Sequence, residues 1–91
     1  MDIKHGSKSF YIGESEEAPL AEMSYVYSSE KLIIIDHTTV GDELSGQGAG
    51  KKLLKKLVDW ARNENLKIMP LCTFAKAQME KHEEYHDMIY K

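Results

Sequence analysis

The 91-residue sequence contains a single cysteine, Cys72, so the chain cannot form an internal disulfide bond. Such sparing use of cysteine fits a reducing compartment. The sequence has no run of about 20 apolar residues, the length that a bilayer-spanning helix needs. Its first residues also lack the apolar stretch of a signal peptide. We therefore expect a cytoplasmic protein with no membrane partner.

An excess of positive charge is also lacking. The formal net charge is −3 at pH 7, whereas proteins that bind nucleic acid over a broad surface are basic. We therefore expect no nucleic-acid partner. Lysines gather only locally, at Lys51, Lys52, Lys55 and Lys56. Such a cluster is typical either of a solvated helix face or of a local basic site.

The chain is short and contains no repeat, linker or low-complexity segment, so we expect residues 1–91 to form one domain with one modest core. Alternating or β-branched stretches predict four strands, and apolar residues at helical spacing predict two helices. The expected strands are 8–13, 20–28, 32–40 and 67–74, and the expected helices are about 48–63 and 75–90.

These elements predict an α+β fold with a mixed sheet. The first three strands are expected to form an antiparallel meander. The helix at 48–63 then leads from strand 32–40 to a parallel partner, through a crossover that is right-handed in nearly all proteins. The unbroken apolar run at the start of strand 32–40 is typical of a central strand covered on both faces.

Pro70 interrupts the last expected strand. Proline has no N–H for a sheet ladder and therefore occurs at edges, strand starts or bulges. Pro70 indicates either an ordinary edge strand or a place where strand 67–74 separates from strand 32–40.

The segment SGQGAG, residues 45–50, places three glycines just before a strongly helical run. Glycine costs about 1 kcal/mol relative to alanine within a helix. Lys51 and Lys52 follow at once, although cations are disfavoured in the first turn. The free N–H groups of a helix N-terminus bind anions, and glycine lets a ligand approach the backbone. The segment therefore predicts a phosphate-binding loop, with a tight turn and a close-packed helix start as the alternative.

Two phosphate-binding motifs fit this segment poorly. A P-loop ending at Gly50-Lys51 would need glycine at position 45 and serine or threonine at position 52. A dinucleotide fingerprint would need its third glycine one residue later. The acyl-CoA signature [QR]-x-x-G-x-[GA] fits better, because only its first position, Ser45, departs.

This loop and its helix, together with the later run PLCTFAKAQMEKHEEY, resemble the GNAT superfamily of acetyl-CoA-dependent N-acetyltransferases, in a minimal branch of small single-domain proteins. The resemblance extends over Leu32–Tyr90 and implies acetyl-CoA as cosubstrate and an amine as acceptor. It implies contacts to CoA from the end of strand 32–40, from the loop, and from the place where the parallel strands splay. These positions are Thr39, Val40, Ser45, Gly46, Gln47, Gly48, Ala49, Gly50, Lys51 and Pro70.

The resemblance also places His37 and Cys72 near the acetyl group. A histidine side chain can exchange a proton near neutral pH, so His37 is either a general base or substrate positioner, or a structural histidine. Cys72 is a small buried hydrophobe, a pocket wall or proton donor, or a nucleophile that forms an acyl-enzyme. Tyr85 is either a proton donor to the departing thiolate or a core tyrosine.

Two further hypotheses come from HEEYH and from chain length. HEEYH, residues 82–86, matches the helical zinc-protease motif H-E-x-x-H, in which His82 and His86 would share a face. Too few residues follow to supply the third protein ligand of a catalytic zinc site, so we expect no metal.

The chain is also too short for the helices that shape the acceptor site in larger superfamily members. A CoA-binding or interaction module with little catalysis is therefore the alternative to an N-acetyltransferase.

Overall fold

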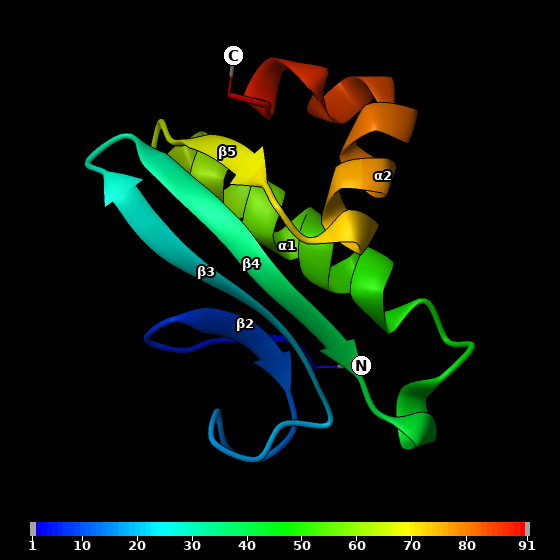
Figure 1. Cartoon of the computed structure of the whole chain (residues 1–91). Coiled ribbons are helices and arrows are strands. Elements are labelled where there is room, and N and C mark those ends of the chain that lie inside the picture. The colour runs from blue at the N-terminus through cyan, green and yellow to red at the C-terminus, as the bar shows by residue number, and fades with distance from the viewer. Residues whose placement is uncertain (1, 91) are drawn as a thin grey trace.

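The computed structural model describes residues 2–90 and confirms the mixed α+β fold. Five strands lie in the order β1-β2-β3-β4-β5, antiparallel except for the parallel pair β4–β5. Helix α1 crosses one face of this sheet, and α2 lies near the β5 edge (Figure 1). The elements are β1 (Lys4–His5), β2 (Ser9–Ile12), β3 (Ala21–Ser29), β4 (Leu32–Val40), η1 (Asp42–Leu44), α1 (Ala49–Asn63), β5 (Lys67–Pro70), α2 (Thr73–Lys81) and η2 (Glu83–Met88).

Three element predictions were wrong in part. The two-residue strand β1 was missed, because periodicity cannot be read over two residues. The strand expected to reach position 74 ends at Pro70, and α2 begins at Thr73. The helix expected to run to position 90 ends at Lys81, because His82 has extended backbone angles, φ −102° and ψ 110°. Residues 83–88 then form a separate 3₁₀ segment.

The core lies between the sheet and α1. The buried residues of α1 recur at helical spacing and pack with the buried residues of β3 and β4, while its lysines stay exposed. Burying one such leucine stabilises the fold by about 1.5–3 kcal/mol. The fully buried members include Met23, Ile33, Ile35, Leu53, Leu54 and Leu57.

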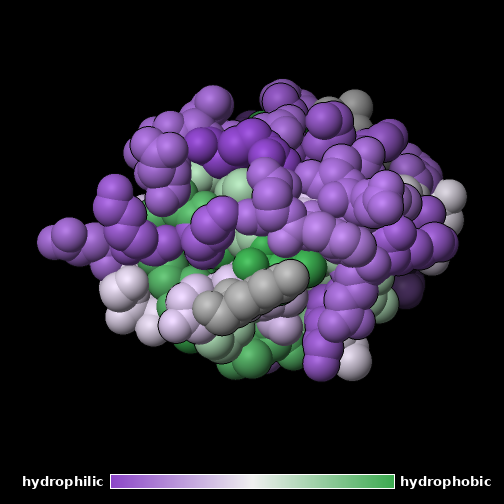
Figure 2. All heavy atoms as spheres, turned by 90° about the horizontal axis from the view of Figure 1, so that it is seen from above, coloured by the Kyte–Doolittle hydropathy of each residue, from purple (hydrophilic) through white to green (hydrophobic). Residues whose placement is uncertain are grey.

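The other face of the sheet is open, so the expectation that β4 is covered on both faces was wrong. Ile33 and Ile35 are fully buried, whereas the intervening Ile34 is only partly buried and Val26 beside it on β3 is 49% exposed. The view from above shows mostly hydrophilic side chains and a smaller hydrophobic area (Figure 2). Among residues 2–90, no helix is long and apolar enough to cross a membrane.

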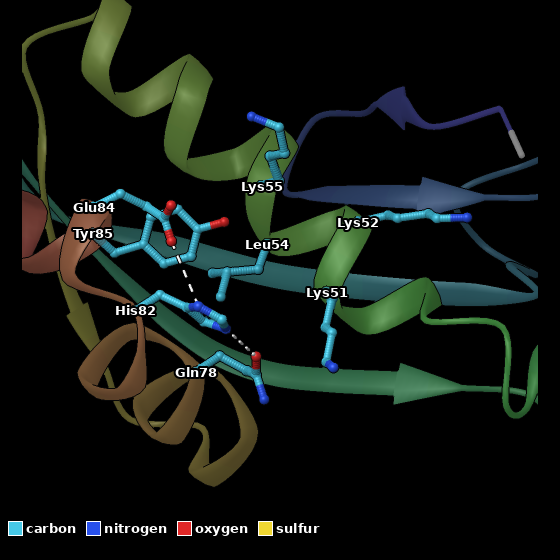
Figure 3. Close-up of a pocket in the computed structure, with 8 residues that line it drawn as sticks. All are labelled: Lys51, Lys52, Leu54, Lys55, Gln78, His82, Glu84 and Tyr85. Carbon is cyan, nitrogen blue, oxygen red and sulfur yellow. Dashed lines mark hydrogen bonds and ion pairs between the residues drawn. The ribbon is translucent and has the colours of Figure 1, made fainter.

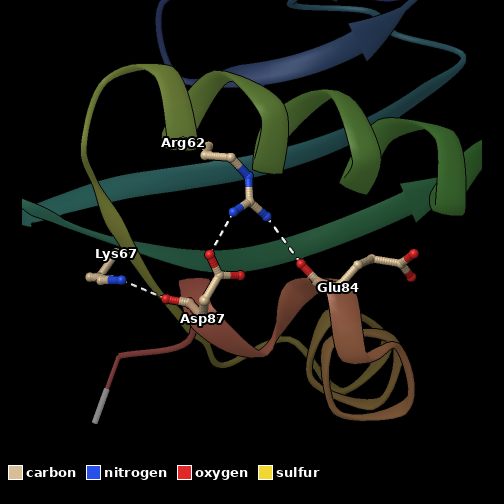
Figure 4. A network of polar contacts seen from close by, with 4 residues as sticks. All are labelled: Arg62, Lys67, Glu84 and Asp87. Atoms are coloured by element: carbon tan, nitrogen blue, oxygen red, sulfur yellow. Dashed lines mark hydrogen bonds and ion pairs between the residues drawn. The ribbon is translucent and has the colours of Figure 1, made fainter.

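Polar contacts fix both ends of the described chain. Near the C-terminus, Arg62 of α1 forms an ion pair with Asp87 and donates to the carbonyl of Glu84, while Lys67 donates to the carbonyl of Asp87 (Figure 4). Together these contacts hold η2 against α1 and β5. Near the N-terminus, the carboxylate of Glu16 accepts hydrogen bonds from the turn between β1 and β2. The loop that carries Glu16 is thereby attached to the meander.

Candidate active site

Strand β4 extends beyond its parallel neighbour β5. The pairing runs from Leu32 opposite Lys67 to Ile35 opposite Pro70, and there β5 ends. The N–H groups of Leu71 and Cys72 both donate to the carbonyl of Ile35, at 3.0 and 3.2 Å, as the chain turns toward α2. Residues 36–40 of β4 therefore pair only with β3. The predicted separation of the two parallel strands is present.

Pro70 is not the cause of this separation. The amides of Lys67 and Leu71 donate to β4, at the carbonyls of Lys31 and Ile35. Because N–H groups alternate sides along a strand, the nitrogen of Pro70 faces the outer edge of the sheet. The edge-strand interpretation therefore explains Pro70, and the turn into α2 explains the separation.

The three glycines of the loop serve two different purposes. Gly46 and Gly48 have φ values of +81° and +73°, and a Cβ at either position would meet no atom within 4 Å. Their need for glycine is conformational, since left-handed backbone disfavours a side chain. Gly50 instead packs against α2, because a Cβ there would lie 2.8 Å from the ring of Phe74. Gly50 therefore also fits the alternative of a close-packed helix start, although it still lines the loop side of the site.

The start of α1 has free hydrogen-bond donors. The N-cap residue Gly48 has no side chain to cap the helix, and the first turn contains no acidic residue. The first backbone hydrogen bond of the helix runs from the N–H of Lys52 to the carbonyl of Gly48. Within residues 2–90, backbone hydrogen bonds leave five amides of this segment without an acceptor: Gly46, Gly48, Ala49, Gly50 and Lys51. Such a row of N–H groups at a helix N-terminus favours an anion.

A hollow of about 410 Å³ lies between this loop and the end of β4. It includes most of the residues predicted to contact CoA and adds three that the sequence did not indicate: Thr38, Leu44 and Phe74. Three predicted residues, Thr39, Gln47 and Pro70, do not line it. Thr39 pairs with Glu22, and the side chain of Gln47 donates to the carbonyl of Glu43. The predicted lining residues are Val40, Ser45, Gly46, Gly48, Ala49, Gly50 and Lys51.

Cys72 lies at this site, although not on a strand as expected. It is the residue just before α2 and is partly buried. Its thiol donates to the hydroxyl of Thr38 across the gap that follows β5, with a Sγ–Oγ1 distance of 3.1 Å. Since Thr38 also lines the loop hollow, the thiol borders the place where β4 and β5 separate.

His37 approaches the same region from the other face of the sheet. It pairs with Ser24, whereas Thr38 pairs with Met23, which is fully buried under α1. The register of β3 and β4 shifts beside Ser24, and the hydroxyl of Ser24 donates to Asp36 at 2.6 Å. Asp36 and the exposed His37 therefore both lie on the open face. The sequence did not indicate Asp36, because this irregularity depends on pairing between strands.

Tyr85 lies elsewhere, in a second hollow of about 330 Å³ between α1 and the C-terminal segment (Figure 3). This second hollow and the loop hollow share only Lys51 among their lining residues. Burial, together with the charge of Glu84, raises the pKa of Tyr85 above its ordinary value, so its hydroxyl gives up a proton less readily than an ordinary tyrosine does. Tyr85 does not line the loop hollow, and its role as proton donor stays a prediction.

The HEEYH segment does not place its histidines on one helical face. The ring of His82 contacts the side chain of Gln78, whereas that of His86 contacts the carbonyl of Glu80. Within residues 2–90, no three His, Cys, Asp or Glu side chains are arranged to hold a metal ion.

Comparison with known proteins assigns the family. The family model for GCN5-related N-acetyltransferases matches residues 9–88. The solution structure of a candidate GCN5-like N-acetyltransferase from Staphylococcus aureus is 50% identical in sequence, with a TM-score of 0.82 over 98% of this chain and 87% of that chain. No curated protein matches the sequence. The chain belongs to the family of GCN5-related N-acetyltransferases.

Proposed function

We propose that the protein binds acetyl-CoA at the N-terminus of α1 and transfers the acetyl group to an amine. The observation that carries this proposal is the set of free amides at Gly46 and at residues 48–51, beside the stretch of β4 that does not pair with β5. The residues fit a pyrophosphate, since Gly46 and Gly48 leave open space where side chains would stand. Lys51 adds a positive charge to the same hollow.

The rest of the cosubstrate would follow β4. Beyond Ile35 the backbone groups of β4 that face away from β3 no longer pair with β5. An extended amide-bearing chain such as pantetheine can use these groups as a further strand would. The bound cosubstrate would supply an acetyl group activated as a thioester. Ser45 offers a hydroxyl where the family usually has arginine or glutamine, so the backbone would carry most of the phosphate binding.

The acceptor amine would approach from the open face. An ammonium group must lose a proton before it attacks, and His37 is exposed there to accept it. The carboxylate of Asp36 lies on the same face and can attract the cation. The new N–C bond forms as the C–S bond breaks, and the departing thiolate takes a proton. Cys72, whose thiol contacts Thr38 on the other side of the gap, would serve as a pocket wall or as the donor of that proton.

A CoA-binding module with little catalysis is the second proposal. Strands β2 and β3 are joined by the loop 13–20, which contains turns and bends but no helix. The open face therefore has no helical cover from this connection, and any acceptor site there is shallow. A cytoplasmic location likewise stays a prediction from the sequence.

Calorimetry and a thiol-release assay separate the two proposals. Acetyl-CoA is titrated first, and CoA release is then followed with a panel of amines, peptides and polyamines. Catalysis predicts micromolar binding and amine-dependent release, whereas binding without release favours the module. Absence of binding would contradict both. His37→Ala should lower turnover with little change in acetyl-CoA affinity, and His86→Ala, an exposed histidine outside the site, should change neither.

The role of Cys72 is tested by intact-mass spectrometry after exposure to acetyl-CoA. Direct transfer predicts no stable acetyl adduct on the only cysteine of the chain. If Cys72 is only a pocket wall, Cys72→Ala should retain most of the turnover. An adduct that disappears when an amine is added would instead establish a covalent route.

A further inference from the structure

The second hollow, between α1 and the C-terminal segment, is not used by the function proposed above. One side of it is formed by α1 and the other by the end of α2 and the start of η2 (Figure 3). Lys51 lines both this hollow and the loop hollow, so the two sites adjoin at one side chain. The lining residues are Lys51, Lys52, Leu54, Lys55, Gln78, His82, Glu84 and Tyr85.

The hollow has more positive than negative charge. Within residues 2–90, neither Lys51 nor Lys52 forms an ion pair, and both stand in the first turn of α1, where the helix dipole opposes a cation. Lys55 pairs weakly with Asp59 at 3.4 Å, in an exposed position. The only carboxylate of the lining, Glu84, lies 3.5 Å from the ring of His82. An anion bound here would offset this accumulation of charge.

The opposite side of the hollow supplies neutral donors. Gln78 contacts His82 through its oxygen, at 3.2 Å, so its amide nitrogen stays available. Figure 3 shows Lys51 extending from α1 toward Gln78, while Lys52 and Lys55 leave the helix in other directions. The phenol of Tyr85 is protonated at neutral pH, as an ordinary tyrosine is, and burial raises its pKa further. A phosphate between Lys51 and the α2 side would therefore meet a cation together with uncharged hydrogen-bond donors.

We propose that this hollow binds the ribose 3′-phosphate of CoA, an inference that rests on acetyl-CoA binding at the loop. The cosubstrate carries this phosphomonoester separately from its pyrophosphate, and a phosphomonoester has a charge of about −1.5 to −2 at pH 7. Two adjoining hollows that share Lys51 match two phosphate groups joined through one ribose. Lys51 would contact both groups, which explains why a lysine stands in the first turn of α1.

The test compares CoA with dephospho-CoA, which lacks only the 3′-phosphate. Calorimetry at low salt should show CoA binding about tenfold more tightly to the unmodified protein. Lys51→Ala should weaken both ligands and should also reduce this ratio to about twofold. Gln78→Ala should lower the ratio while leaving dephospho-CoA affinity unchanged. Lys56→Ala is the matched control, because Lys56 is an exposed lysine of α1 outside this hollow, and it should keep the ratio.

The outcomes distinguish this inference from the proposed function. Equal affinity for CoA and dephospho-CoA would overturn the 3′-phosphate site and leave acetyl-CoA binding intact. If Lys51→Ala lowers the affinity for CoA and for dephospho-CoA by the same factor, Lys51 contacts only the pyrophosphate, and this result would also overturn the inference. If neither ligand binds, both the inference and the proposed function are wrong. Adenosine 3′,5′-bisphosphate should compete with CoA more strongly than adenosine 5′-phosphate does, and equal competition would count against the site.

Discussion

The two halves of β4 have different surroundings. Residues 32–35 pair with β3 on one side and with β5 on the other, and Ile33 and Ile35 are fully buried. Residues 36–40 pair with β3 alone, and His37, Thr39 and Val40 are exposed. The first half of β4 is therefore part of the core, and the second half presents an accessible backbone edge.

The contrast arises from neighbours rather than from strand propensity. Both halves are rich in β-branched residues, which favour strands wherever they stand. The difference begins where the chain leaves β5 at Leu71 and turns toward α2. From that point the outward backbone groups of β4 need other partners, and a buried backbone group without a partner is costly. An exposed edge beside an anion site is a place where an extended ligand can supply them.

Truncating a side chain in each half should give the largest difference. Ile35→Ala should lower the free energy of unfolding by about 2–5 kcal/mol, because the side chain of Ile35 is fully buried in the core between the sheet and α1. Thr39→Ala, in the exposed half, should change it by about 0.5 kcal/mol or less. Urea denaturation followed by the fluorescence of Trp60 measures both. Equal losses would contradict the division of β4 into two halves.

The glycines next to the exposed half give the second test. Gly48→Ala should destabilise the protein by about 1–2 kcal/mol, because Gly48 has left-handed backbone at φ +73°. It should also weaken acetyl-CoA binding, since the new methyl group would point into open space where the ligand is proposed to lie. Gly50→Ala should destabilise the protein through contact with Phe74.

The partner ring provides the control for these glycine variants. The loss of stability in the double variant Gly50→Ala with Phe74→Leu should be smaller than the sum of the two single losses, since the added methyl group no longer meets the ring. For Gly48→Ala with Phe74→Leu, the two single losses should simply add. A double loss smaller than the sum in both pairs would mean that Gly48, too, is present for packing.

The sequence predicted the elements whose signal is local. Strand 32–40 was placed with its observed bounds, and the glycine segment with its helix was recognised because composition and spacing suffice there. The break at His82 was missed because helical periodicity continues past it, although the backbone does not. The shared face of Asp36 and His37 was missed because it depends on the register shift between β3 and β4. The hollow beside Tyr85 was missed because three separate elements form it.

Acid should destabilise the antiparallel strands β1–β3, of which β3 is the strand that pairs with the exposed half of β4. Hydrogen bonds from the amide of Lys8, the hydroxyl of Ser9 and the amide and hydroxyl of Ser7 lower the pKa of Glu16 from 4.5 to about 2. A carboxyl whose pKa is lowered by folding stabilises the fold fully above pH 4.5, and this contribution is lost as the pH falls toward 2. Glu16→Gln should therefore show a smaller change in urea midpoint between pH 5 and pH 2.5 than the unmodified protein.

The neighbouring carboxylate is the control for this pH dependence. Glu17 is exposed and accepts none of the hydrogen bonds made by the turn before β2. Glu17→Gln should keep the full acid dependence of the unmodified protein. Identical pH profiles for Glu16→Gln and the unmodified protein would show that the carboxylate does not hold the loop to the meander. If the carboxylate does hold the loop, amide exchange in acid should rise first at residues 36–40, which pair with β3 and not with β5.

Replacing Pro70 should have little effect on stability and none on acetyl-CoA affinity, and it tests what separates the two strands. Pro70→Ala adds an N–H on the outer edge of β5, because the amide of the next residue, Leu71, already points toward β4. We expect a change in the free energy of unfolding of about 1 kcal/mol or less and unchanged acetyl-CoA affinity. Hydrogen exchange should still show unprotected amides on the exposed half of β4. New protection there, together with weaker acetyl-CoA binding, would mean that the proline keeps the strands apart after all, and that the turn into α2 is its consequence.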